Sequence, residues 1–188
     1  INATGGFDTI NSINSLELSY SANFMGNALE ATLINSADEQ KQIIKMGGNV
    51  LATVTVNASG AKVDQMGNSM DLPPEMAADM LAVIGIVPEL KMMENENVTV
   101  TGIEEVDGQK AYAIEMKGQS TTTTTYYSVE SGLKLKQTTV TEMMGQTQTQ
   151  DTTYGNYKSF GGLLIPTTTT VPLGPQAVDA NLTNVKIN

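Results

Sequence analysis

The residues from 98 to 170 consist of short β-prone runs that are separated by turn dipeptides. The clearest dipeptide is Asp107-Gly108, which favours a type I′ turn because both central residues of that turn need a positive φ. The other turn signals in this stretch are Lys117-Gly118, Ser131-Gly132, Gly145 and Gly161-Gly162. Strand-like runs joined by such turns predict an antiparallel meander of about five strands.

A second series of strands is predicted between residues 15 and 66. Its first run alternates apolar and polar residues over its whole length, which is typical of a strand with one buried face. The residues on that face are Leu16, Leu18, Tyr20, Ala22 and Phe24. Gly47-Gly48 signals a hairpin turn later in the same series. In the later series, Gly102 interrupts the alternation and suggests a β-bulge.

Two segments favour helix instead of strand. Residues 3–11 predict a short helix, and residues 71–93 predict a helical insert between the two series of strands. Pro74 suits the first turn of the insert, Glu75 suits its positive end, and Gly85 suits the position after its last residue. The apolar face of the insert, at helical spacing, consists of Met76, Met80, Leu81 and Ile84.

Together these elements predict one domain of residues 1–188 in the α+β class, mainly β, with strands at 15–66 and 97–187. A sheet of roughly ten strands with one apolar face curls or closes. We therefore expect a curved antiparallel sheet, or half-open β-barrel. The helical insert must bury its apolar face, and the concave face of the sheet is the apolar surface available. The insert is expected to cover it.

Composition excludes several classes of function. The net charge is −10, all ten basic residues are lysines, and there is no His, Cys or Trp. An acidic chain without arginine is a poor partner for nucleic acid or for an anionic membrane. Catalytic pairs that use His or Cys cannot form, and neither can an HxxEH zinc site. We therefore expect no enzyme, no metal and no cofactor. No apolar run approaches the ~18 residues of a membrane helix.

Carboxylates offer little alternative chemistry. Glu104 and Glu105 are adjacent, but neighbouring strand residues point to opposite faces and so do not converge. The sequence also has no D-x-D-x-D-G loop for calcium.

The chain contains eleven methionines. Methionine is flexible and polarisable, so two interpretations stay open: an adaptable cavity for an acyl chain or lipid, or ordinary core filling. In the first interpretation, the residues expected to form the hydrophobic cavity and its lid are Phe24, Leu33, Met46, Val54, Met76, Met80, Ile84, Met93 and Met116.

Two local phrases resemble the Lol-type periplasmic lipoprotein carriers, as does the order of elements. They are Tyr126-Tyr127-Ser128-Val129-Glu130-Ser131-Gly132-Leu133-Lys134 and Tyr154-Gly155-Asn156-Tyr157-Lys158, the second followed by Gly161-Gly162 and Ile165-Pro166. The resemblance implies a half-open β-barrel with helices in its mouth. Lol carriers lock lid to barrel with an arginine, and this chain departs from them because it has none.

The chain is also similar to the C-terminal domain of some Bacteroidetes insulinase-type zinc proteases, from Gly5-Gly6-Phe7 to Lys186-Ile187-Asn188. The resemblances imply a non-catalytic binding module of the periplasm or outer cell envelope. Its partner would be an acyl chain, a lipoprotein or a hydrophobic peptide. The alternative is an accessory domain that contacts the peptidase modules of a parent chain. The sequence begins at Ile1 without Met, so we expect a fragment or a processed form.

Overall fold

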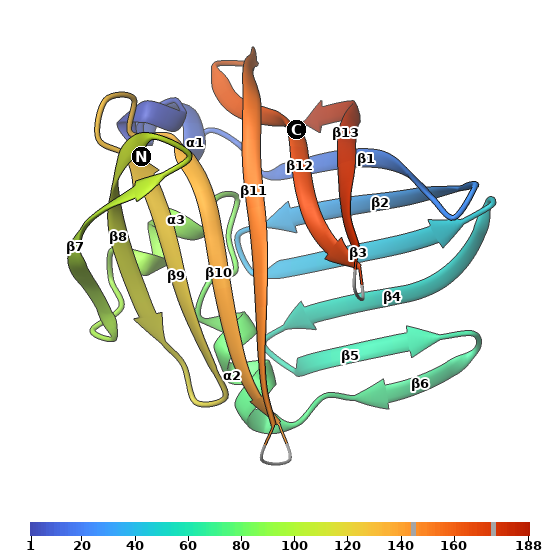
Figure 1. Ribbon diagram of the computed structural model, residues 1–188. Coiled ribbons are helices and arrows are strands. Elements are labelled where there is room, and N and C mark those ends of the chain that lie inside the picture. Colours follow the sequence, from blue (N-terminus) through green and yellow to red (C-terminus); the bar gives the residue numbers. More distant parts are fainter. Residues whose placement is uncertain (144–145, 174–175) are drawn as a thin grey trace.

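A computed structural model describes residues 1–143, 146–173 and 176–188. In these residues, thirteen strands form a single antiparallel sheet (Figure 1). The first series comprises β1 (Ser15–Phe24), β2 (Asn27–Ser36), β3 (Glu39–Met46), β4 (Asn49–Asn57), β5 (Gly60–Gln65) and β6 (Asn68–Asp71). The second comprises β7 (Val98–Val106), β8 (Gln109–Lys117), β9 (Thr121–Ser128), β10 (Lys134–Met143), β11 (Gln146–Phe160), β12 (Leu163–Leu173) and β13 (Gln176–Ile187).

The sheet is curved and unclosed. Its spatial order runs from β6 through β1, then across to β13 and on to β7, so β6 and β7 form the two edges of the described sheet. In Figure 1 the strands β1–β6 run across the view and β8–β11 run down it, with α2 between the lower ends of β9 and β10 and the ends of β4 and β5. The predicted mainly β fold, a curved antiparallel sheet with a helical insert, is confirmed.

Local irregularities match some of the turn and bulge signals. The register of β7 and β8 shifts between Val100 and Gly102, where Gly102 has a φ of 154°, which confirms the predicted bulge. Asp107 and Gly108 have φ values of 49° and 78°, as a type I′ turn requires. The predicted turn at Gly145 lies outside the described residues.

The helices are shorter than predicted. The first segment is a 3-10 turn, Asn2–Thr4, followed by α1 (Phe7–Asn11), because Gly5 and Gly6 take positive φ values of 138° and 82° and interrupt a continuous helix. The insert holds α2 (Pro74–Leu81) and α3 (Pro88–Met92).

The expectation that Gly85 follows the last helical residue is wrong. Helix α2 ends at Leu81, and Ala82 caps it in the right-handed region with a φ of −61°. Strand β6 was not predicted. It consists of Asn68–Asp71 alone, which is too short to show a clear alternation of apolar and polar residues.

Two clusters of buried residues hold the helices against the concave face. The first joins α1 to β1 and β12 and consists of Ile10, Ile13, Leu16, Leu18, Ile86, Leu163 and Ile165. The second joins α2 to β4 and β5 and consists of Val56, Ala61, Ala77 and Ile84. Tyr20 packs against the first cluster, whereas Phe24 lies further along the same face and is half-buried. The insert therefore covers the concave face with its apolar side.

Candidate functional site

A cavity of about 280 Å³ lies between the insert and strands β8, β9 and β10, and we call it the insert cavity. The insert supplies the residues on one side: Met76, Asp79, Met80, Val83, Pro88 and Met92. The sheet supplies the other side: Met116, Thr121, Thr123, Thr125, Lys134, Gln137 and Thr139. The helix side is thus mostly apolar, and the sheet side is mostly polar.

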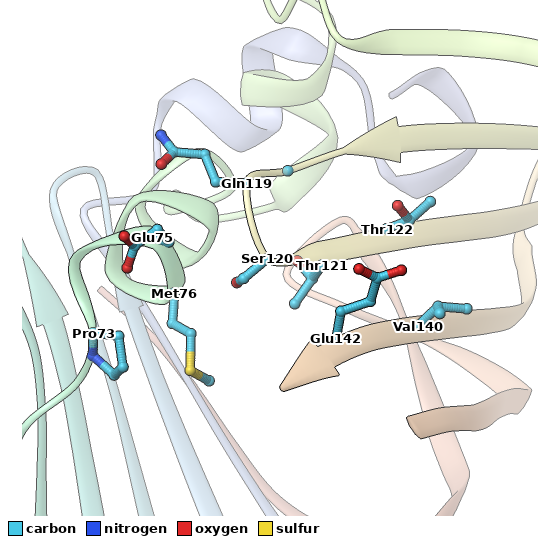
Figure 2. Close-up of a pocket in the computed structure, with 10 residues that line it drawn as sticks. Pro73, Glu75, Met76, Gln119, Ser120, Thr121, Thr122, Val140 and Glu142 are labelled. Atoms are coloured by element: carbon cyan, nitrogen blue, oxygen red, sulfur yellow. The ribbon is translucent and has the colours of Figure 1, made fainter. Parts of the chain in front are cut away.

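Two of the grooves beside the insert cavity share a methionine of the insert with it. The mouth groove, of about 500 Å³, lies at the start of α2 and shares Met76 and Thr121 with the cavity. Figure 2 shows Met76 on the α2 side of this groove and Glu142 on the strand side. The α3 groove, of about 270 Å³, shares Met92 with the cavity. Met76 and Met92 therefore each line both the cavity and one of these grooves.

The buried Asp79 of α2 ties the insert to the loop between β8 and β9. The backbone N–H of Gln119 donates to Oδ1 at 2.6 Å, and those of Ser120 and Thr121 donate to Oδ2 at 2.8 and 2.9 Å. The hydroxyls of Ser120 and Thr121 also donate to Oδ2, at 2.9 and 3.1 Å. Burial raises the pKa of Asp79, but these hydrogen bonds outweigh it, so that the pKa lies below its ordinary value.

Gly118 makes room for this carboxylate. A Cβ at position 118 would lie 2.3 Å from Asp79 Oδ1 and 2.6 Å from Oδ2. The predicted Lys117-Gly118 turn is therefore a longer loop, residues 118–120, whose backbone donors point at Asp79.

A second polar contact ties α3 to the sheet. Glu89 Oε1 accepts from the Tyr127 hydroxyl at 2.8 Å and pairs with Lys134 Nζ at 3.0 Å. Lys134 Nζ also lies 5.3 Å from the centroid of the Tyr154 ring. Burial raises the pKa of Glu89. The Lys134 charge and the hydrogen bonds from Lys134 and Tyr127 together lower it by more, so the pKa lies below its ordinary value. Lys134 and Glu89 therefore stay ionised as a pair.

The nine predicted site residues separate into groups. Met76, Met80 and Met116 line the insert cavity. Ile84 belongs to the cluster beneath α2, and Val54 packs against it. By register, Phe24, Leu33 and Met46 lie on the concave face, but they line neither the insert cavity nor the mouth groove or the α3 groove. Met93 is 64% exposed and lines the α3 groove.

The sequence reasoning missed the polar residues of the site. Asp79 lies between Ala78 and Met80 in the apolar half of α2, and an acid at that place is a signal that could have found it. Glu89 and Lys134 come from a helix and a distant strand, and their pairing follows only from the fold.

Comparison with known proteins gives likeness of structure only. No protein-family model matches the chain, and no curated protein matches it. A LolA superfamily protein from Nitrosomonas europaea superposes with a TM-score of 0.61 at 10% identity, covering 96% of this chain and 91% of that one. A DUF1329 family protein from Desulfovibrio piger gives 0.57 at 12% identity, covering 96% and 88%.

A third structure, a Vibrio parahaemolyticus domain assigned to outer membrane lipoprotein sorting, gives a TM-score of 0.57 at 11% identity, covering 92% and 84%. None of the described helices has the length and apolar character needed to cross a membrane. Identities this low establish the fold alone. The chain has the curved, unclosed sheet of the LolA-like structures.

Proposed function

We propose that this protein is a non-catalytic module of the cell envelope that binds an apolar ligand in the insert cavity. The ligand would be an acyl chain, an acylated protein or a hydrophobic peptide. The observation that carries the proposal is the cavity of about 280 Å³ under a methionine-rich insert, which shares Met76 with the mouth groove and Met92 with the α3 groove. Small ligands bind in concave, largely apolar pockets of about 300–1,000 Å³, and this cavity is close to the lower end of that range.

The lining of the cavity supports an adaptable occupant. Met76, Met80 and Met92 reach into it from the insert, and Met116 reaches in from β8. Methionine side chains have three rotatable bonds and a polarisable sulfur, so they pack against apolar partners of varied shape. A chain longer than the cavity would extend past Met76 or Met92 into the groove that the same methionine lines.

The envelope location is supported by the likeness to a domain assigned to outer membrane lipoprotein sorting. The alternative, an accessory domain of an insulinase-type protease, remains a prediction from the sequence. That alternative needs an external contact surface and makes no use of the cavity. Finding peptidase modules in the same reading frame, together with an empty cavity in the purified protein, would favour it.

Native mass spectrometry of gently purified protein tests the proposal. We expect an added mass that organic extraction removes. The variant Thr123→Phe places an aromatic ring in the cavity from the sheet side, so it should carry less of that mass while keeping the β-type circular dichroism spectrum. Thr99→Phe, at an exposed position on β7, is the matched control and should retain it. If neither adduct nor apolar dye binds the wild type, the proposal fails.

A further inference from the structure

The insert cavity has two chemically different sides. The insert presents methionine, valine and proline, together with Asp79, whose carboxylate already accepts hydrogen bonds from residues 119–121. Strands β9 and β10 present hydroxyl, amide and ammonium groups from Thr123, Thr125, Gln137, Thr139 and Lys134. A pure hydrocarbon would satisfy the helix side but would cover the polar groups without offering them a partner. Covering polar groups in this way costs free energy. The complementary ligand therefore carries an acceptor on one side of an apolar chain.

Lys134 is the strongest donor on the sheet side. Its side chain is only 17% exposed, and its Nζ is paired with Glu89 Oε1 at 3.0 Å. An ammonium group has three N–H donors, so one carboxylate oxygen does not exhaust it. A hydrogen bond from a charged donor is also stronger than one between neutral groups.

The charge of this pair determines which acceptor fits. Glu89 already neutralises Lys134 within a largely buried setting. An ionised carboxylate on the ligand would add a second negative charge close to Glu89, and removing that charge from water is costly. The oxygen of a neutral carbonyl can accept from Lys134 and leave the existing pair intact.

We propose that Lys134 forms a subsite for a neutral carbonyl, so that the insert cavity selects acyl esters over free fatty acids and over hydrocarbons. The carbonyl oxygen accepts from Lys134 Nζ, and the chain lies against Met76, Met80 and Met92. This inference rests on the proposed function, because it assigns the ligand class of the same cavity.

Displacement of an apolar dye by three probes of matched length tests this at pH 8: methyl dodecanoate, dodecanoate and dodecane. In the wild type we expect the ester to bind most tightly. The double variant Glu89→Gln/Lys134→Met removes the pair together, and its ester-to-hydrocarbon affinity ratio should fall about tenfold, the value of one charge-assisted hydrogen bond. Comparing ratios between proteins cancels the different solubilities of the probes.

The matched control removes a different ion pair, whose lysine lies on the same strand as Lys134. Lys136 Nζ pairs with Asp151 Oδ2 at 2.8 Å, and neither residue lines the cavity. The variant Lys136→Met/Asp151→Asn should keep the wild-type ratio. An unchanged ratio in the Glu89→Gln/Lys134→Met variant would overturn the subsite while leaving apolar binding intact. If no probe displaces the dye from the wild type, the proposed function itself fails.

A single variant tests the charge argument separately. Glu89→Gln leaves Lys134 without its counter-charge, so dodecanoate should now bind more tightly than the ester. This reversal requires no loss of Lys134, and it can be measured even where the double variant does not fold. If the wild type prefers dodecanoate, or if Glu89→Gln leaves the order unchanged, selection of a neutral carbonyl is wrong.

Discussion

The backbone N–H of Ser120 lies 2.8 Å from Asp79 Oδ2, and the hydroxyl of the same serine lies 2.9 Å from that oxygen, although the two residues are 41 positions apart. This contact joins the insert to the loop between β8 and β9. Since Asp79 also lines the insert cavity, the same carboxylate that fastens the insert stands at the edge of the space beneath it. The contact must break before α2 can move away from β9.

Replacing Asp79 by Asn should loosen α2. The amide keeps only one acceptor oxygen, and its NH2 group would face backbone donors, so we expect α2 docking to weaken by about 1.5–3 kcal/mol, the range for hydrogen bonds to a charged group. Hydrogen exchange should accelerate in residues 74–81 and much less in β11 and β12. Glu75→Gln, an exposed change on the same helix, is the control. Equal exchange in the two variants would contradict the prediction.

Gly118→Ala should disturb the same contact without altering any charge. The added methyl would lie within 2.6 Å of both carboxylate oxygens of Asp79, so the side chain has to leave its backbone donors. We expect a lower midpoint of thermal unfolding and faster exchange in α2. Gly155→Ala is the matched control, because a Cβ there meets no heavy atom within 4 Å. A Gly118→Ala protein as stable as the Gly155→Ala protein would show that Asp79 does not depend on this space.

Acid should release the insert. The pKa of Asp79 is lower in the folded protein than in the unfolded chain. Its stabilising contribution is therefore complete above the unfolded value, about 3.9, and declines as the pH falls toward the lower folded value. The pKa of Glu89 is shifted in the same direction, so acid weakens both attachments of the insert. Dye binding to the wild type should rise below about pH 4.

The Asp79→Asn protein shows how much of the stability lost in acid comes from titration of Asp79. Its difference in unfolding free energy from the wild type should be constant above about pH 5 and should shrink at lower pH, as the wild-type carboxylate takes up a proton. Urea denaturation at a series of pH values measures it. A difference that stays constant down to pH 2 would rule out titration of Asp79 as the cause.

Met80→Asp distinguishes a movable insert from an ordinary part of the core. Met80 lines the cavity and packs against the cluster of Val56, Ala61, Ala77 and Ile84. A carboxylate against hydrocarbon costs several kcal/mol, so α2 should swing out while the hairpins of the sheet persist. We expect strong dye binding with an unchanged β-type circular dichroism spectrum. Loss of the β signal in step with dye binding would instead show cooperative unfolding of a single core.

Much of the fold follows from local sequence. Asp107-Gly108 specifies its turn through two positive φ values, and Gly102 specifies its bulge. Leu16 and Leu18 are buried on the face that their alternation predicts. The turn and strand signals depend on neighbouring residues, which is why they can be read from the chain. The prediction that Gly85 follows the last helical residue was wrong because glycine also occurs at positions where no left-handed cap is needed.

The site was harder to predict because its polar contacts join distant segments. Gly118 reads as a turn residue, yet its role is to leave space for Asp79, a residue 39 positions earlier (118 − 79). The threonines of β9 suit any exposed strand face. Thr123 and Thr125 line a cavity only because the insert lies opposite them, and the local sequence does not show this. The methionine pattern indicated the helix side of the site and gave no sign of the polar side.

The strand order places the insert between the two edges of the sheet. Strands β6 and β7 are the two edges of the described sheet, and residues 72–97, which contain α2 and α3, are the chain that joins one edge to the other. The insert is thus a tether across the open side as well as a cover for the concave face. A helical residue advances about 1.5 Å along the chain and an extended residue about 3.3 Å, so the folded helices keep the connection between the two edges short.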